Sequence, residues 1–210
     1  MCIRDRDYTG PTTFASNSYN LAQDYGRAPQ PTQQLFAGGS VQLPFGIGSN
    51  LFLSTQGGTP FNITTGTDLN GDSIYNDRPA FATAPTAGSV LYNTRFGSFD
   101  ANPQPGEKTI PINYGNSPNF AFLDLSVNRT FKFGPRPAAA AGQKPAPKPD
   151  LPYTLVFTVD AANVLNHRNP GQPVGILSSP LFGQTTSLSN PFTSNTAANR
   201  VVFLQMSFSF

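Results

Sequence analysis

The last eleven residues of the chain, 200–210, alternate between apolar and polar side chains. The apolar members of this alternation are Val202, Leu204, Met206, Phe208 and Phe210. Successive side chains of an extended strand point to opposite faces, so an apolar period of two predicts a β-strand with one apolar face. The chain therefore ends on a predicted strand whose last residue is aromatic.

Four further segments show the same period and are predicted to be strands. They are 33–43, 48–57, 119–133 and 153–161. In the clearest of them, Leu123 and Leu125 stand opposite Asp124 on the other face. Three residues break the alternation: Phe52, Arg129 and Val156. A tight turn at Pro44–Gly46 joins the first two strands, so an all-β fold of antiparallel, up-and-down strands is predicted.

The composition favours strands and loops and excludes several classes of protein. Only 38% of the residues are hydrophobic and 11% are charged, whereas the chain holds 21 Pro and 19 Gly, which favour turns over helices. The net charge is +2 and the basic residues are spread along the chain, so no binding of nucleic acid is predicted. No apolar run approaches the roughly 18 residues that a membrane-spanning helix needs.

The connections between the predicted strands alternate in length. The links 58–118 and 165–199 are long, 44–46 is a tight turn, and 134–152 is an intermediate link rich in Pro and Ala. Compact soluble domains rarely hold structureless loops of the longer kind. Transmembrane β-barrels have short turns on one side of the membrane and long loops on the other. The two long links are therefore predicted to be outer loops, and 134–152 a solvated spacer or, alternatively, a Pro-rich partner motif.

These lengths define the predicted organisation of the chain. Residues 32–210 are expected to form the C-terminal part of a transmembrane β-barrel, and 1–31 the remnant of an extracellular loop. The start lacks the apolar core of a signal peptide, so an export signal is expected to precede this fragment. Residues 1–6 are interpreted as an artefact of assembly, and their Cys2, the single cysteine, cannot form an internal disulfide.

Specific residues resemble a known family. The stretch Gly57–Asp72, continuing to Asn76-Asp77-Arg78-Pro79, and the stretch Asp160–His167 resemble the C-terminal barrel region of TonB-dependent receptors. The resemblance covers about 20–210. It is to the Oar-like, carboxypeptidase-regulatory-domain-containing group found in soil bacteria.

The resemblance implies a barrel of about 22 strands with a plugged lumen in the outer membrane of a Gram-negative bacterium. It implies active uptake of a solute, with outer loops that bind the ligand. The implied partners are outer-membrane lipid, the barrel-insertion machinery, the missing N-terminal plug and remaining barrel strands, and the TonB complex through that plug. Phe208 and Phe210 would be the signal that the insertion machinery reads.

One segment places oxygen-bearing side chains at alternate positions, as calcium-binding loops do. The candidate ligands are Asp68, Asn70, Asp72 and Asp77, with the carbonyl group of Ile74 as an addition. The segment is not an EF-hand, because its glycine comes one place early and Pro79 occupies the place of the bidentate glutamate. The alternative interpretation is that these side chains form Asx turns that shape the loop.

The sequence offers no assembled catalytic site, so an enzyme is not predicted. His167 is the single histidine and Glu107 the single glutamate, and no Gly-x-Ser-x-Gly elbow or phosphate-binding loop occurs. Asp124 and Asp160 share the polar face of neighbouring strands, where they form either a carboxylate pair or part of a polar lumen wall. Apart from calcium, no cofactor is predicted.

A rival interpretation is a secreted, calcium-binding β-sandwich for adhesion or glycan recognition, in which the two faces of the strands are core and solvent. It predicts a soluble monomer, whereas a barrel fragment needs detergent. The aromatic residues favour the barrel, because Phe131, Phe133, Tyr153, Phe208 and Phe210 gather near strand ends, where a barrel carries its aromatic girdle.

Overall fold

The computed structural model describes residues 14–24, 26–83, 85–135, 151–189 and 199–210. The described residues fall into two compact units. The sheet unit comprises the described parts of Leu35–Thr55, Ala121–Arg168 and Phe192–Phe210. The loop unit comprises those of Met1–Gln34, Gln56–Phe120 and Asn169–Pro191. No helix within the described residues is long and apolar enough to cross a membrane.

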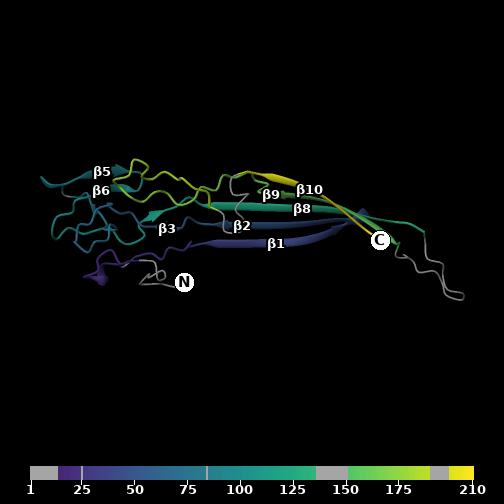
Figure 1. The fold of residues 1–210 in the computed structure, drawn as a ribbon, viewed down its shortest axis with the longest axis horizontal. Coiled ribbons are helices and arrows are strands. Elements are labelled where there is room, and N and C mark those ends of the chain that lie inside the picture. The colour runs from purple at the N-terminus through teal and green to yellow at the C-terminus, as the bar shows by residue number, and fades with distance from the viewer. Residues whose placement is uncertain (1–13, 25, 84, 136–150, 190–198) are drawn as a thin grey trace. The chain divides into compact units, whose positions relative to one another are not determined.

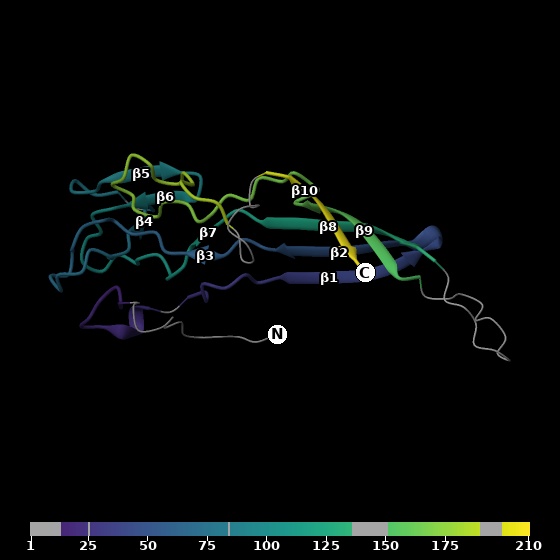
Figure 2. The ribbon, with the colours of Figure 1, turned by 45° about the vertical axis from the view of Figure 1, so that its right-hand side comes forward.

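The sheet unit is built from five long strands. They are β1 (Gln34–Leu43), β2 (Ile47–Gln56), β8 (Phe120–Phe133), β9 (Tyr153–Ala162) and β10 (Val201–Ser209). They are hydrogen-bonded in the order β1-β2-β8-β9-β10, and Figures 1 and 2 show them side by side. Each predicted strand is confirmed to within one residue at either end, because a period of two is a strong signal when it extends over nine residues or more.

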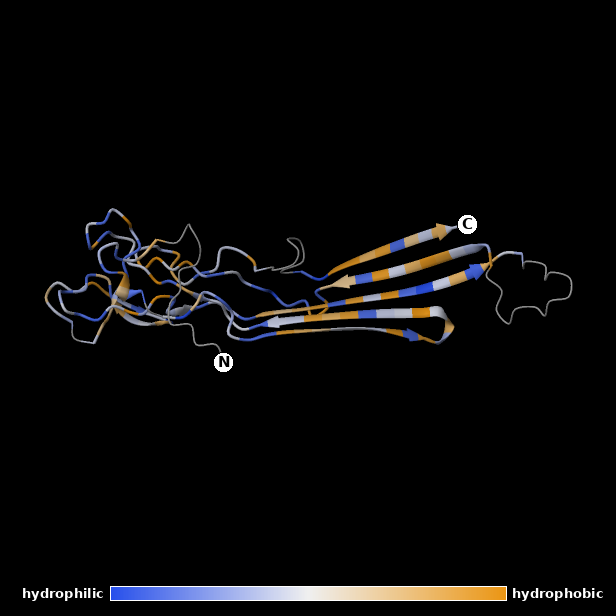
Figure 3. Cartoon of the chain, turned by 90° about the horizontal axis from the view of Figure 1, so that it is seen from below, coloured by the Kyte–Doolittle hydropathy of each residue, from blue (hydrophilic) through white to orange (hydrophobic). Residues whose placement is uncertain are grey.

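The register of the sheet gathers the apolar side chains on one face. Leu204 pairs with Val159, and Val159 pairs with Val127 on its other side. Side chains of directly paired residues point to the same face, so a continuous apolar surface crosses β8, β9 and β10. The intervening positions are mainly polar, as in the pair Gln205 and Thr158. Figure 3 shows this alternation along the strands.

The predicted turn between β1 and β2 is confirmed as a 3-10 turn, η2 (Pro44–Gly46). Phe45 and Gly46 both have left-handed backbones, with φ values of 67° and 71°. Glycine is required at the second position for a further reason, because a Cβ atom there would lie 3.0 Å from the carbonyl oxygen of Thr130 on β8. The turn therefore brings its backbone close to the neighbouring strand.

The loop unit contains short elements that the alternation did not reveal. Besides η1 (Leu21–Gln23), they are β3 (Pro60–Phe61), β4 (Ala80–Phe81), β5 (Leu91–Thr94), β6 (Gly97–Asp100) and β7 (Gly115–Asn116). Strands β3 and β7 form one small sheet, and β4, β6 and β5 form another. The described part of the long connection 58–118, predicted as an outer loop, therefore contains five short strands.

A hydrophobic core holds the loop unit together. Its buried members are Phe61, Ile63, Phe99, Ile110 and Leu177, and aromatic rings pack around them. Phe99 lies edge-on to Tyr114, with the ring centroids 5.9 Å apart, in the arrangement that aromatic pairs prefer. Backbone bonds add to this packing, because the N–H of Leu177 donates to the carbonyl oxygen of Thr64 at 2.9 Å. The described parts of the connections 58–118 and 165–199 thus share one core.

We expect Phe99→Ala to loosen the loop unit, because the ring is fully buried and its removal leaves a cavity. Such a replacement costs about 3 to 5 kcal/mol. The measurement is the rate at which a protease cleaves the loops of the purified full-length protein. Tyr75→Ala is the matched control, since the Tyr75 side chain is 69% exposed. Equal cleavage rates in the two variants would contradict the assigned core.

Candidate functional site

Within the loop unit, the segment before β1 is bound to the rest of the unit by hydrogen bonds between residues far apart in the sequence. The side-chain amide of Asn70 donates to the carbonyl oxygen of Ser16 at 2.9 Å. The backbone N–H of Ser18 donates to Asp72 at 2.9 Å, and the side-chain amide of Asn76 donates to the carbonyl oxygen of Ala15 at 3.0 Å. The region 14–24, predicted as a loop remnant, is therefore an integral wall of this unit.

A buried ion pair lies behind that wall. The Nη2 atom of Arg78 is 3.1 Å from Oδ1 of Asp24, and both side chains are almost fully buried. The same Nη2 donates to the carbonyl oxygen of Gln23 at 2.7 Å, while Asp24 accepts bonds from the backbone N–H and the hydroxyl of Ser16. Burial lowers the pKa of Arg78, and the charges of Asp24 and Asp77 oppose that shift. The guanidinium remains charged, as arginine does in proteins.

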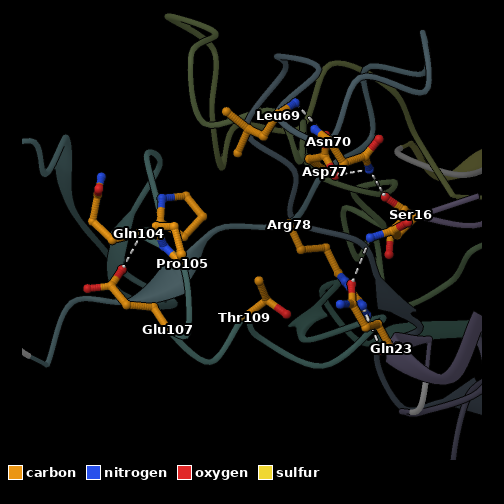
Figure 4. Close-up of a pocket in the computed structure, with 12 residues that line it drawn as sticks. Ser16, Gln23, Leu69, Asn70, Asp77, Arg78, Gln104, Pro105, Glu107 and Thr109 are labelled. Atoms are coloured by element: carbon orange, nitrogen blue, oxygen red, sulfur yellow. Dashed lines mark hydrogen bonds between the residues drawn. The ribbon is translucent and has the colours of Figure 1, made fainter. Parts of the chain in front are cut away.

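Arg78 also lines a cavity of about 320 Å³ in the loop unit (Figure 4). The other residues that line it are Ser16, Asn17, Gln23, Leu69, Asn70, Asp77, Pro103, Gln104, Pro105, Glu107 and Thr109. Figure 4 shows Gln104, Pro105 and Glu107 across the cavity from Asp77 and Arg78. The Nε and Nη1 atoms of Arg78 are buried and have no hydrogen-bond acceptor among the described residues. These atoms are enclosed, so the guanidinium lies behind the polar wall of the cavity.

The structure brings the four predicted calcium ligands into one loop but engages them with backbone groups. Asp68 accepts bonds from the N–H groups of Gly71 and Ser73, and Asp72 accepts one from Ile74. These are the contacts of Asx turns. Within the described residues, no three His, Cys, Asp or Glu side chains are grouped to hold a metal. The turn contacts are therefore observed, and the calcium site stays a prediction.

Two of these carboxyl groups have shifted pKa values of opposite sign. The backbone N–H of Ser18 is the main cause that lowers the pKa of Asp72. Burial raises the pKa of Asp77, although N–H donors from Leu69 and Asn70 oppose the shift. The Asp77 carboxylate lies at the centre of the turn and accepts a bond of 2.6 Å from the backbone of Leu69. Asp77 therefore joins the two ends of this loop, because its carboxylate accepts hydrogen bonds from Leu69 and Asn70 and it is followed directly by Arg78.

The two aspartates of the polar strand face line one hollow in the sheet unit, of about 340 Å³. Asp160 lies opposite Ser126 in the register, and Asp124 accepts a bond of 3.0 Å from the backbone N–H of Asn163. His167 does not line the hollow; its backbone groups bond to the side chain of Asn163. The structure thus places the carboxylates along a shared wall, whereas Glu107 lies at the cavity of the loop unit.

The aromatic residues at one end of the strands form a cluster, as predicted. Phe208 stacks on Phe133 and Tyr153, with ring centroids 6.2 and 6.0 Å apart, and Phe210 follows at 6.1 Å from Phe208. The Phe210 side chain is 94% exposed. Aromatic rings exposed at a strand end are typical of a membrane interface.

Sequence reasoning missed the role of Arg78 and Asp24. Arg78 was noted only as part of the resemblance, and Asp24 was not singled out. The partners are far apart in the chain: 55 positions separate Gln23 from Arg78, and no periodic pattern links such residues. One signal was available, because Arg78 is followed by the apolar run Pro79-Ala80-Phe81, and a charge beside a buried run needs a partner.

Comparison with known proteins gives one match. A family model described as an outer membrane beta barrel domain matches residues 2–202. Neither the curated proteins nor the solved structures compared with the chain give a match. The matched residues include β1, β2, β8 and β9 in full, and their pairing and exposed apolar face agree with such a domain.

We expect Asp68→Ala to open the loop around residues 68–77, because the backbone N–H groups of Gly71 and Ser73 lose their acceptor. The measurement is protease cleavage of this loop in the purified full-length protein, with Tyr75→Ala as control. The same assay with calcium and with a chelator tests the predicted metal site. Protection of the unsubstituted loop by calcium would support that site, and equal cleavage in both buffers would contradict it.

Proposed function

The chain belongs to the outer membrane beta barrel family, and from this membership we propose that it is part of a TonB-dependent receptor that takes up a solute. Its place is the outer membrane. In this proposal the strands of the sheet unit form part of the barrel wall, and the loop unit contributes to ligand binding outside the cell. The chain itself is proposed to have no enzymatic activity.

The two faces of the sheet support a wall between lipid and an aqueous lumen. The exposed apolar side chains on β10 include Leu204 at 81% and Met206 at 66%, and a soluble protein rarely leaves so large an apolar surface open. The opposite face carries polar residues such as Asn128 and Thr158. A secreted β-sandwich would bury its apolar face, so this feature and the family membership favour the barrel over that alternative.

The folded loop unit with its cavity is the observation that carries the proposal of ligand binding. In an up-and-down sheet, the connection from β2 to β8 and the connection from β9 to β10 leave from the same ends of the strands. Both connections contribute to one hydrophobic core. Polar loops that served only as spacers would not need such a core, whereas a binding loop needs a fixed shape.

The proposed partners follow from the same reasoning and from the resemblance to TonB-dependent receptors. Lipid would cover the apolar face of the sheet, and further barrel strands would satisfy the backbone edges of β1 and β10. The plug and the TonB complex would supply gating and energy. No nucleic acid is proposed as a partner, and calcium is retained only as a predicted ligand of the loop 68–77.

The proposal is tested by solute uptake in the native bacterium with and without the gene for the full-length protein. We expect at least one solute to be depleted from the medium only when the protein is present. Addition of a protonophore should stop this depletion, because TonB-dependent transport needs an energised inner membrane. Depletion that survives the protonophore, or equal depletion of every solute without the gene, would contradict the proposal.

Because one face of the sheet is apolar and the other polar, we expect the same substitution at two neighbouring positions of β10 to have different effects. Leu204→Arg places a charge on the lipid face, at a cost of about 2 to 4 kcal/mol near the membrane centre, and we expect it to reduce the folded fraction. Gln205→Arg faces the polar side and is the matched control. Heat-modifiability of the full-length protein on gels measures the folded fraction. Equal fractions for both variants would be incompatible with the assigned faces.

Phe208 and Phe210 are proposed to be read by the insertion machinery. Replacing both with Asp should prevent insertion of the full-length protein into the outer membrane, since it removes the aromatic stack with Phe133 and Tyr153. Membrane fractionation measures the inserted amount. Ser207→Asp with Ser209→Asp adds the same charge to the opposite face as a control. Normal insertion of the Phe208 and Phe210 variant would refute the signal.

A further inference from the structure

We propose that a second cavity of the loop unit, the Arg27 cavity, binds a small solute that carries a carboxylate group next to an aromatic ring. This inference rests on the proposed function, because it names the class of ligand that the outer loops would take. Three observations carry it: an exposed arginine without a carboxylate partner, backbone contacts that hold this arginine in place, and aromatic side chains in the wall of the cavity.

The Arg27 cavity lies where three segments of the loop unit meet. The segment after η1 contributes Gly26 and Arg27, the turn between β5 and β6 contributes Phe96, and the segment 111–116 contributes Tyr114 and Asn116. The volume is about 620 Å³, within the range of sites that take small organic molecules, roughly 300 to 1,000 Å³. The described residues that line it include one arginine and no Asp or Glu, so a ligand there meets a positive charge.

The backbone around Arg27 is held in place from two directions. Gly26 forms a parallel β-bridge with Ile112, and a Cβ atom on Gly26 would lie 2.4 Å from the carbonyl oxygen of Ile112. Glycine is therefore required for this close approach. On the other side, the carbonyl oxygen of Arg27 accepts a hydrogen bond of 2.6 Å from the side-chain amide of Asn113. The arginine thus projects from a fixed point of the cavity wall.

The guanidinium of Arg27 is oriented, but its charge is not neutralised. Its Nη2 atom donates to the carbonyl oxygens of Tyr114 and Gly115, the second at 3.2 Å. Both acceptors are uncharged, and no Asp or Glu of the described residues forms an ion pair with Arg27. Arginine has five N–H donors, so those of Nε and Nη1 remain. Unlike the enclosed Arg78, Arg27 is an exposed residue and lines its cavity. An anion there gains charge-assisted hydrogen bonds.

The aromatic part of the wall is also fixed. Phe96 lies edge-on to Phe61, with the ring centroids 5.4 Å apart, and Tyr114 lies edge-on to Phe99 at 5.9 Å. Rings that are held by such packing offer a flat apolar surface at little cost in conformational freedom. The guanidinium carbon of Arg95 lies 4.6 Å from the centre of the Phe96 ring, so a second positive charge stands beside this wall. The wall therefore suits an aromatic ring that carries a negative charge.

The contacts of Arg27 favour a carboxylate over a phosphate. Its Nη2 atom is already engaged by two carbonyl oxygens, and this atom belongs to both pairs of nitrogens through which arginine holds an anion with two parallel bonds. One lining cation without its full fork suits a single negative charge better than the nearly two charges of a phosphate. Tyr114 and Asn116 line the same cavity, and their hydroxyl and amide groups can donate to the second carboxylate oxygen.

The first experiment measures binding to the purified full-length protein in detergent by saturation-transfer NMR and calorimetry. The probes are benzoate, 2-naphthoate and indole-3-acetate, each with its neutral amide, and inorganic phosphate as a further anion. We expect at least one of the carboxylates to bind, and its amide to bind about tenfold more weakly or worse, because the amide lacks the charge. Absence of binding for all three carboxylates, equal binding of the amides, or tighter binding of phosphate would overturn the inference.

The second experiment places the carboxylate in the cavity. Arg27→Gln removes the charge but keeps a donor for the carbonyl oxygen of Tyr114, and Asn116→Asp adds a negative charge at an exposed position without changing the size of the side chain. Each variant should weaken binding about tenfold or more. Arg200→Gln is the matched control, because Arg200 is exposed in the sheet unit and donates to the carbonyl oxygen of Val164 at 3.4 Å. Unchanged binding in both cavity variants, or the same loss in the control, would overturn the site.

The outcomes separate this inference from the proposed function. If no carboxylate binds but the gene still confers protonophore-sensitive uptake of another solute, the ligand class is wrong and the receptor function stands. If a carboxylate binds in the cavity but no uptake depends on the gene, the site is supported and transport is refuted. Cleavage of each variant by protease, compared with that of the unsubstituted protein, verifies that the loop unit has kept its fold.

Discussion

The sheet depends on one constraint: inside a membrane, every backbone N–H and C=O group must find a partner within the protein. Antiparallel pairing meets this requirement for β8, β9 and β10 residue by residue. Once the backbone is satisfied, side chains alone decide what each face contacts. In transmembrane barrels, lipid covers the apolar face, which then needs no protein partner, and the polar face lines the lumen.

The loop unit is stabilised by different physics. It buries aromatic and aliphatic side chains around Phe61 and Phe99 and ties its outer segment down through the pair of Asp24 and Arg78. Removing one partner of such a buried pair costs about 3 to 5 kcal/mol, although a hydrophobic replacement of both is often neutral. The main effect of the pair is therefore to position the segment 14–24 and not to add stability. It holds this segment against the cavity wall and leaves the Nε and Nη1 donors of Arg78 without a partner among the described residues.

The sequence predicted the long strands and missed most of the loop unit for a physical reason. Alternation over nine or more residues identifies β10 at its full length, whereas β3, of two residues, is too short to show a period. The spacing of Asp68, Asn70 and Asp72 was correctly noted but has two physical interpretations, since the same oxygens serve a cation or backbone N–H groups. The spacing within the loop cannot show which hydrogen-bond donors lie near these oxygens, because one donor to Asp72 is the backbone N–H of Ser18, 54 positions away in the chain.

Arg129 shows how an exception to the pattern carries information. The alternation put this charge on the apolar face, and the register confirms that it pairs with Phe157 there. Its guanidinium carbon lies 4.6 Å from the centre of the Phe131 ring, a distance at which the ring face attracts a cation. Phe131 precedes the aromatic cluster of Phe133 and Phe208, so the long side chain of Arg129 is close enough to the interface to keep its charge in the headgroup layer. The contact with the Phe131 ring and the length of the side chain therefore explain how a charge is accommodated on the apolar face of β8.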